Sequence, residues 1–194
     1  MKPYTVRPLT PDLWPRLEEL FGPIGACNGC WCMFWRIGSV YTKRARDENR
    51  ADFKRIVKKG PPPGLLAFSG DTVVGWVQVT PRASLPGLDR SRMTAAVDDK
   101  PVWSISCFYI RRGWRGKGVV SALIDAAVEF ARKARAPVLE AYPVIVDGQK
   151  KSATSVYTGV ASSFEKAGFK TIAAHVAHRP IMRLDLERSR RKAG

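Results

Sequence analysis

The chain has 194 residues, 45% of them hydrophobic and 26% charged. This is the composition of one ordinary globular domain and excludes a collagen-like, largely disordered or miniature disulfide-stabilised protein. Lysine plus arginine exceed aspartate plus glutamate by 33 to 17, which predicts affinity for a polyanion: a nucleic acid, an acidic membrane surface or a polyphosphate cofactor. No apolar run is long enough for a membrane span, and the N-terminal residues lack the apolar stretch of a secretory signal. We therefore expect a cytoplasmic protein, outside the membrane, whose cysteines are reduced thiols.

The first half of the chain predicts two helices and three strands. In chain order we expect a strand over residues 4–9, a helix over 11–20 and an irregular segment over 22–38. A basic amphipathic helix over 44–58 and a β-hairpin over 65–82 follow. Pro11 is expected at the first helical position, after Thr10 as the N-cap. The hairpin is indicated by two β-rich runs that flank Ser69-Gly70-Asp71.

The second half predicts a βαβ unit and a final pair of strands. After a polar loop over residues 81–100 we expect a strand over 102–110, a helix over 116–134 and a strand over 137–144. A helix over 155–167 and two strands over 169–176 and 180–186 follow. The order β-α-α-β-β-β-α-β-α-β-β predicts an α/β (mixed α+β) fold with a central mixed, largely antiparallel sheet of about 6–7 strands flanked by helices. We expect one domain over residues 1–187 and a disordered basic tail over 188–194.

Residues 107–124 carry the clearest chemical signal in the chain. A buried strand runs into a loop rich in glycine and arginine, which leads directly into an amphipathic helix. The first turn of a helix has N–H groups without intrahelical partners and partial positive charge, so it binds anions. Gly116 and Gly118 allow close approach of the backbone, while Arg115 and Lys117 add full charges. We therefore predict an anion site at this turn.

Two common phosphate-binding loops do not fit this turn. A Walker A loop needs a glycine five residues ahead of the glycine of its Gly-Lys pair and a hydroxyl residue after the lysine, but Arg111 and Gly118 stand at those positions. A dinucleotide fingerprint needs G-x-G-x-x-G, and Ser121 replaces its third glycine.

The stretch from the strand through Arg115-Gly-Lys-Gly-Val-Val120 resembles the coenzyme A-binding motif Q/R-x-x-G-x-G/A of the GNAT acyltransferases, with Val120 in place of the small last residue. Phe164-Glu-Lys-Ala-Gly-Phe-Lys170 is similar to the Y-E-K-x-G-F segment of the same family. The resemblance covers roughly residues 65–186 and implies a GNAT-like fold, acetyl-CoA as cosubstrate and an amine acceptor. It implies that the pyrophosphate binds the turn and that the pantetheine arm lies along the strand before it. The implied cofactor-binding residues are Phe108, Tyr109, Ile110, Arg115, Gly116, Lys117, Gly118, Val119 and Val120.

The resemblance also implies direct attack of the amine on the thioester, with main-chain N–H groups of the strand holding the oxyanion. The family often uses a tyrosine as general acid where this chain has Phe164. Tyr157, expected two helical turns earlier on the same face, is a candidate replacement. For the base we consider Glu140, a lone carboxylate in an apolar strand; the alternative is a structural carboxylate paired with arginine.

Three cysteines, Cys27, Cys30 and Cys32, lie within a segment rich in aromatic residues. Half of a zinc site without a second half is weak evidence for metal, so we predict none. Instead we expect the segment to line the acceptor pocket, with Cys30, Trp31 and Trp35 binding the acceptor; the alternative is core packing.

We therefore predict an acetyl-CoA-dependent N-acetyltransferase, monomeric or homodimeric, that acts on a small-molecule amine or peptide. Two alternatives stay open. The charge and the basic helix suit a nucleic-acid-binding protein, and Phe164 suits a GNAT-like protein that binds acyl-CoA without catalysis.

Overall fold

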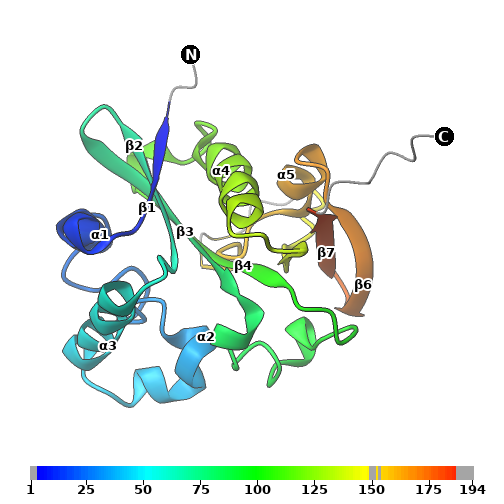
Figure 1. Cartoon of the computed structure of the whole chain (residues 1–194), viewed down its shortest axis with the longest axis horizontal. Helices are drawn as coiled ribbons and strands as arrows, with labels where there is room; N and C mark the ends of the chain where they lie inside the picture. Colours follow the sequence, from blue (N-terminus) through cyan, green and yellow to red (C-terminus); the bar gives the residue numbers. More distant parts are fainter. Residues whose placement is uncertain (1–3, 149–151, 153, 187–194) are drawn as a thin grey trace.

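A computed structural model describes residues 4–148, 152 and 154–186. Its core is a mixed sheet of seven strands in the order β1-β2-β3-β4-β5-β7-β6 (Figure 1). The strands are β1 (Thr5–Pro8), β2 (Gly64–Ser69), β3 (Thr72–Pro81), β4 (Trp103–Ile110), β5 (Val138–Ala141), β6 (Lys170–Val176) and β7 (Arg179–Asp185). All neighbours are antiparallel except β4 and β5, which the crossover through a helix makes parallel.

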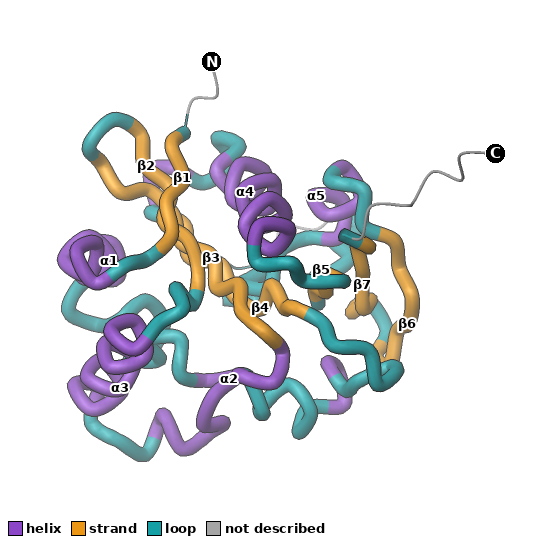
Figure 2. The backbone as a smooth tube through the Cα atoms, in the orientation of Figure 1, coloured by secondary structure: helices purple, strands orange, loops and turns teal. Residues whose placement is uncertain are grey.

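Helices cover both faces of this sheet. They are α1 (Trp14–Phe21), α2 (Phe34–Ile37), α3 (Arg46–Lys59), α4 (Val119–Lys133) and α5 (Ala161–Lys166). Helices α1 and α3 lie on one face, while α4 and α5 lie on the other (Figure 2). Strand β2 shows why two cores form: Leu65 and Ala67 pack toward α4, whereas Leu66 and Phe68 pack toward α1 and α3. Successive side chains of a strand point to opposite faces, so a continuously apolar strand feeds both cores.

The helix α4 approaches the sheet closely at its N-terminus. A side chain at Gly75 of β3 would come within 2.7 Å of Val119, the first residue of α4. Gly75 is therefore favoured at this position. Because it has no side chain, the first turn of α4 can pack directly on β3, next to β4.

Strands β4 and β5 pair over only three residue pairs, Trp103–Leu139, Ser104–Glu140 and Ile105–Ala141. Beyond Ile105 the register of β4 with β3 shifts by one residue at Ser106, opposite Gln78 and Val79. A bulge of this kind bends a strand and ends regular pairing. The second half of β4 is consequently free of β5, and its outer edge faces a space between the two strands.

The predicted fold class and the order of the predicted elements are confirmed, with differences in extent and one added helix. The strand expected over 137–144 is shortened to β5. The helix expected over 11–20 begins as the 3₁₀ turn Pro11–Leu13 before α1. The irregular segment contains the short helix α2, which the sequence analysis did not predict. The helix expected over 155–167 is confined to α5, because Gly159 has a φ of +89° and Val160 is extended. The expected tail, residues 188–194, lies outside the described residues. Within the described part, no helix is long and apolar enough to cross a membrane.

Candidate functional site

A pocket of about 800 Å³ opens where β4 separates from β5. Most of its lining comes from the second half of β4, the turn into α4, the segment from Ala26 to Tyr41, and residues between 154 and 163. Phe21 of α1 and Gln78 of β3 complete it. The pocket therefore joins the predicted anion site to the predicted acceptor segment, which are distant in the sequence.

The turn before α4 has the geometry of an anion site. Gly116 and Gly118 have φ of +73° and +81°, and Gly118 is the N-cap of α4. No atom lies within 4 Å of the Cβ position at either glycine, so the space beside the turn is open. The first backbone bond of α4 runs from Ala122 N–H to Gly118 carbonyl, which leaves the N–H groups of Val119–Ser121 without partners inside the helix. These groups share the pocket with Arg115.

Eight of the nine expected cofactor residues line the pocket, namely Phe108, Tyr109, Ile110, Arg115, Gly116, Gly118, Val119 and Val120. Lys117 is the exception. Its Nζ lies 5.3 Å from the centre of the Trp114 ring, and its carbonyl accepts a 2.6 Å hydrogen bond from Tyr4 Oη. Lys117 therefore contributes charge to the outer surface of the turn rather than to the pocket wall.

The free edge of β4 is partly occupied by the chain itself. The Phe108 N–H donates a 2.6 Å hydrogen bond to the carbonyl of Tyr157. Because alternate N–H groups of a strand point to the same edge, Ile110 N–H faces the same side as Phe108 N–H. Any ligand that accepts a hydrogen bond from the Phe108 N–H must displace the Tyr157 carbonyl, a competition that the sequence analysis did not foresee.

Tyr157 lines the pocket, as expected, but it is not on a helix. The expectation that it shares a helical face with Phe164 is wrong, since α5 begins only at Ala161. Phe164 itself is fully buried and packs edge-on against Phe108 and Phe169. Burial raises the pKa of the Tyr157 phenol well above its ordinary value, so the hydroxyl remains a proton donor at neutral pH.

The cysteine segment forms one wall of the pocket, and all four cysteines of the chain line it. Cys30 and Trp35 lie on this wall as expected. Burial, with the neighbouring Cys32, raises the pKa of the Cys30 thiol to about 12. The pKa of Cys107 on β4 is also raised, first by a hydrogen bond with Cys32 and then by burial. These thiols are neutral at physiological pH and are poor nucleophiles.

Trp31 was expected in this wall, and its placement corrects that expectation. Its side chain is 3% exposed and packs against Trp14 and Phe21 in the core beneath α1 and α3. Its φ of +43° turns the chain there, so that Trp31 points into the core while Cys30 lines the pocket. Phe34 and Tyr41, which the sequence analysis did not select, complete the wall. Their aromatic character was the available signal, but only the fold of the segment shows which rings face inward.

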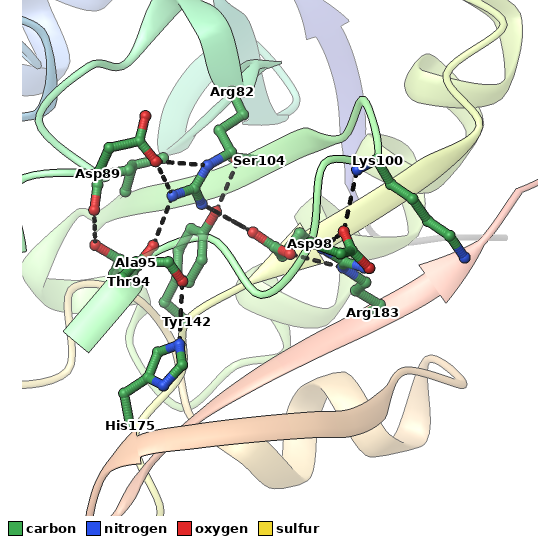
Figure 3. Close-up of polar contacts among 12 residues, drawn as sticks. Arg82, Asp89, Thr94, Ala95, Asp98, Lys100, Ser104, Tyr142, His175 and Arg183 are labelled. Atoms are coloured by element: carbon green, nitrogen blue, oxygen red, sulfur yellow. Dashed lines mark hydrogen bonds and ion pairs between the residues drawn. The ribbon is translucent and has the colours of Figure 1, made fainter. Parts of the chain in front are cut away.

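Glu140 does not line the pocket. The carboxylate is 1% exposed and accepts hydrogen bonds from Arg82 Nη1 at 3.0 Å, Arg183 Nε at 2.7 Å and Tyr142 Oη at 2.6 Å. Figure 3 shows the surrounding network, in which Asp89 binds Arg82 and Asp98 binds Arg183. A carboxylate already paired with two guanidinium groups has no free position for a substrate proton, so the role of general base is withdrawn and the structural alternative holds.

Neither histidine lines the pocket. His175 on β6 approaches the Ala95 carbonyl at 3.2 Å, and His178 lies 3.4 Å from Asp147. Among the described residues, no group of three or more histidine, cysteine and acidic side chains has the arrangement of a metal site.

Comparison with known proteins identifies the family. The model of the acetyltransferase (GNAT) family matches residues 30–158, which is more than half of the chain. The chain belongs to the GNAT acetyltransferases. The family uses acetyl-CoA, in agreement with the cofactor that the motif predicted. A search of curated proteins finds no match.

Solved structures support the GNAT fold at low sequence identity. The agmatine N-acetyltransferase, in an apo mutant form, is 10% identical with a TM-score of 0.58, over 95% of this chain and 100% of that one. A Salmonella typhimurium protein described as an acetyltransferase, solved with its cofactor acetyl-CoA, is 15% identical with a TM-score of 0.55, over 96% and 95%. The PaiA N-acetyltransferase of Thermoplasma acidophilum, in complex with coenzyme A, is 15% identical with a TM-score of 0.52, over 94% and 98%. The chain spans 45% of one matched chain, from Pyrococcus horikoshii.

The basic helix predicted over 44–58 corresponds to α3, and several of its charges are already paired. Arg44 and Arg55 bind Asp52, while Arg50 binds Glu18 of α1. One of these ion pairs joins α3 to α1 and the others lie within the basic segment itself. They reduce the positive charge left on the surface for a nucleic acid. No feature of α3 favours nucleic-acid binding over the family's chemistry.

Proposed function

We propose that this GNAT protein is an acetyl-CoA-dependent N-acetyltransferase, which acylates a primary amine by direct attack on the thioester. One observation carries the proposal: the glycine turn and the first N–H groups of α4 open into the same pocket as the free edge of β4. A phosphate site and a strand edge in one pocket suit a ligand with a pyrophosphate at one end and an amide-bearing arm.

In this proposal the residues of the turn hold the pyrophosphate. The N–H groups of Val119 and Val120 and the Arg115 guanidinium supply hydrogen bonds and charge, while Gly116 and Gly118 leave room for the anion. Ile110 N–H, on the free edge of β4, serves the amide groups of the pantetheine arm. When bound, acetyl-CoA supplies an activated acyl group, and the protein contributes mainly alignment of the two reactants.

Tyr157 is the proposed general acid. Its phenol lines the pocket and stays protonated because burial raises its pKa. It therefore can donate a proton to the departing sulfur. Displacement of the Tyr157 carbonyl from Phe108 N–H would free that donor for the developing oxyanion. The acceptor binds on the opposite wall, beside Cys30 and Trp35.

The test is calorimetric binding of acetyl-CoA to Gly118→Glu. A carboxylate at this open position places negative charge where the pyrophosphate binds, and the loss of even one charge-assisted hydrogen bond costs roughly 1.5–3 kcal/mol, or about ten- to a hundredfold in affinity. Two controls separate the causes. Gly118→Ala adds the backbone strain of a left-handed residue without charge. Gly113→Glu adds the same charge in the preceding 3₁₀ turn, Arg112–Trp114, outside the pocket lining.

Affinity must fall far more in Gly118→Glu than in either control. Equal affinities in all three folded variants would place the anion elsewhere. Catalysis is tested separately by release of free thiol from acetyl-CoA in the presence of a panel of amines. Binding without thiol release for every amine would support a GNAT protein that has lost catalysis.

A further inference from the structure

The acceptor half of the pocket contains no anionic side chain. Its lining comes from α1, the cysteine segment, β3, β4 and the turn at Tyr157, and the described lining residues include no aspartate, glutamate or histidine. Five aromatic residues, Phe21, Phe34, Trp35, Tyr41 and Tyr109, are among its lining residues. The one amide, Gln78, is engaged internally, donating to the Cys32 carbonyl and accepting from Ser106 Oγ.

Three carboxylates on the elements around the pocket are paired with arginines and do not line it. Glu18 and Glu19 of α1 bind Arg50 and Arg111, and Glu140 is enclosed in its network. A positively charged ammonium or guanidinium in the acceptor half has no opposite charge to pair with. Burying such a charge unpaired costs several kcal/mol.

Positive charge borders the same half. The Arg36 guanidinium lies close enough to Cys32 to interact with it electrostatically, and its Nε is buried with no hydrogen-bond partner among the described residues. Arg115 lies in the pocket lining at the cofactor end. Neither arginine supplies the negative charge that a cationic acceptor would need.

Apart from Arg115, the titratable groups that line the pocket are thiols and phenols: Cys27, Cys30, Cys32, Cys107, Tyr41, Tyr109 and Tyr157. Burial raises the pKa of Cys30 and Tyr41, and the pKa values of Cys107 and Tyr157 are raised as well. None of these four groups is ionised near neutral pH, so none accepts a proton from an incoming ammonium.

We propose, on the basis of the proposed function, that the acceptor is a weakly basic aromatic amine, which enters this aromatic, carboxylate-free pocket as the neutral free base. The ring of the acceptor packs among the aromatic side chains, and its amino group faces β4. An alkyl amine with the basicity of a lysine side chain is neutral in only about one molecule in 2,500 at pH 7. The described lining offers no carboxylate or histidine to deprotonate the rest. An amine attached directly to an aromatic ring is neutral without help.

The step balances without a basic side chain. The nitrogen lone pair forms the new C–N bond to the acetyl carbon, and the C–S bond breaks to give the coenzyme A thiolate. The proton lost from the nitrogen ends on the sulfur, with Tyr157 Oη placed to pass it on. The products are the acetylated aromatic amine and coenzyme A thiol.

Two isomeric amines test the proposal with the intact protein. 4-Methylaniline and benzylamine have the same atoms and nearly the same size, but only benzylamine is protonated at pH 7. We expect kcat/KM at pH 7 to be at least tenfold higher for 4-methylaniline and constant between pH 7 and 8.5. For benzylamine it should rise about tenfold per pH unit, following the fraction of free base.

Faster reaction of benzylamine at pH 7, with no rise toward alkaline pH, would overturn the proposal. It would mean that the rings bind the ammonium by cation–π contact and that a base acts on it. Thiol release with agmatine or spermidine but not with 4-methylaniline would overturn it as well. Absence of thiol release with every amine, despite acetyl-CoA binding, would instead count against the proposed function itself.

A variant pair gives an independent measurement. Cys30→Asp places a carboxylate in the acceptor half, and Cys30→Ser is its uncharged control. The ratio of kcat/KM for benzylamine over 4-methylaniline should be at least tenfold higher in the aspartate variant. Equal ratios in two variants that bind acetyl-CoA equally would show that the missing negative charge does not set the acceptor class.

Discussion

Removal of the Glu140 carboxylate should destabilise the protein far more than it slows the reaction. The carboxylate accepts three hydrogen bonds, two of them from guanidinium groups whose side chains are 10–11% exposed. Charged hydrogen bonds contribute roughly 1.5–3 kcal/mol each, but both arginines keep other partners. Arg183 retains Asp98, and Arg82 retains Asp89 and the Thr94 carbonyl.

The expected cost of Glu140→Ala is therefore about 3–5 kcal/mol, the range for breaking a buried ion pair from one side. In a chain of this length that lowers the melting temperature by roughly 6–20 °C. Asp89→Asn is the matched control. It removes a carboxylate from the same Arg82, but at a side chain that is 59% exposed, and should cost less than about 1 kcal/mol.

Urea unfolding followed by tryptophan fluorescence measures the free energy of unfolding of each variant, and thiol release at a temperature where all are folded measures kcat. We expect kcat of folded Glu140→Ala within about threefold of the wild type. A general base contributes about 10²–10⁴ in rate. A loss of that size with unchanged stability would refute the structural role and restore Glu140 to the mechanism.

Three further predictions address the pocket and the network. Tyr157→Phe should lower kcat about ten- to a hundredfold with little change in acetyl-CoA affinity. Because the pKa of the Tyr157 phenol is raised, the wild-type kcat should not fall through loss of this proton below about pH 10. Measurement of kcat against pH for both proteins checks the two expectations. Trp31→Ala should cost about 3–5 kcal/mol of stability because its side chain fills the core, whereas Cys30→Ser should leave the melting temperature nearly unchanged and alter KM for the acceptor; a thermal melt and a kinetic titration separate the two. Hydrogen bonds from Arg183 lower the pKa of Asp98 to about 2. The stabilisation by ionised Asp98 is therefore complete above about pH 4 and is lost as the pH falls toward 2. Urea unfolding at each pH should show a smaller loss of unfolding free energy across this window in Asp98→Asn.

The sequence predicted the elements whose patterns are local. The apolar face of α4, the β-rich runs of β2 and β3, and the glycine turn at Gly116 and Gly118 each depend on neighbouring residues, and each is confirmed. The family motif depends on the same local stretch, which explains why eight of the nine expected cofactor residues line one pocket.

The errors concern side chains whose role depends on distant partners. Glu140 looked isolated because the arginines that bind it lie 58 and 43 residues away in the sequence. Trp31 and Cys30 are adjacent, yet a positive φ at Trp31 sends one into the core and leaves the other in the pocket. A single unusual dihedral angle in a glycine-rich segment has no periodic signature, so no pattern of hydrophobicity distinguishes these two residues.

The buried network also explains why the pocket lies where it does. Ser104 and Glu140 form the middle of the three β4–β5 pairs, and Tyr142, the residue after β5, bonds to both. Arg82, after the end of β3, and Arg183 on β7 reach the same carboxylate from opposite sides. Two buried guanidinium groups that bind one carboxylate require fixed distances and angles. Apolar side chains of similar volume would not constrain the strands in this way. The network thus fixes the three paired residues beneath the bulge at Ser106, and the strands separate immediately above it. Because the free edge of β4 begins at that point, the Glu140 network holds the two strands together at the base of the pocket, although Glu140 itself does not line it.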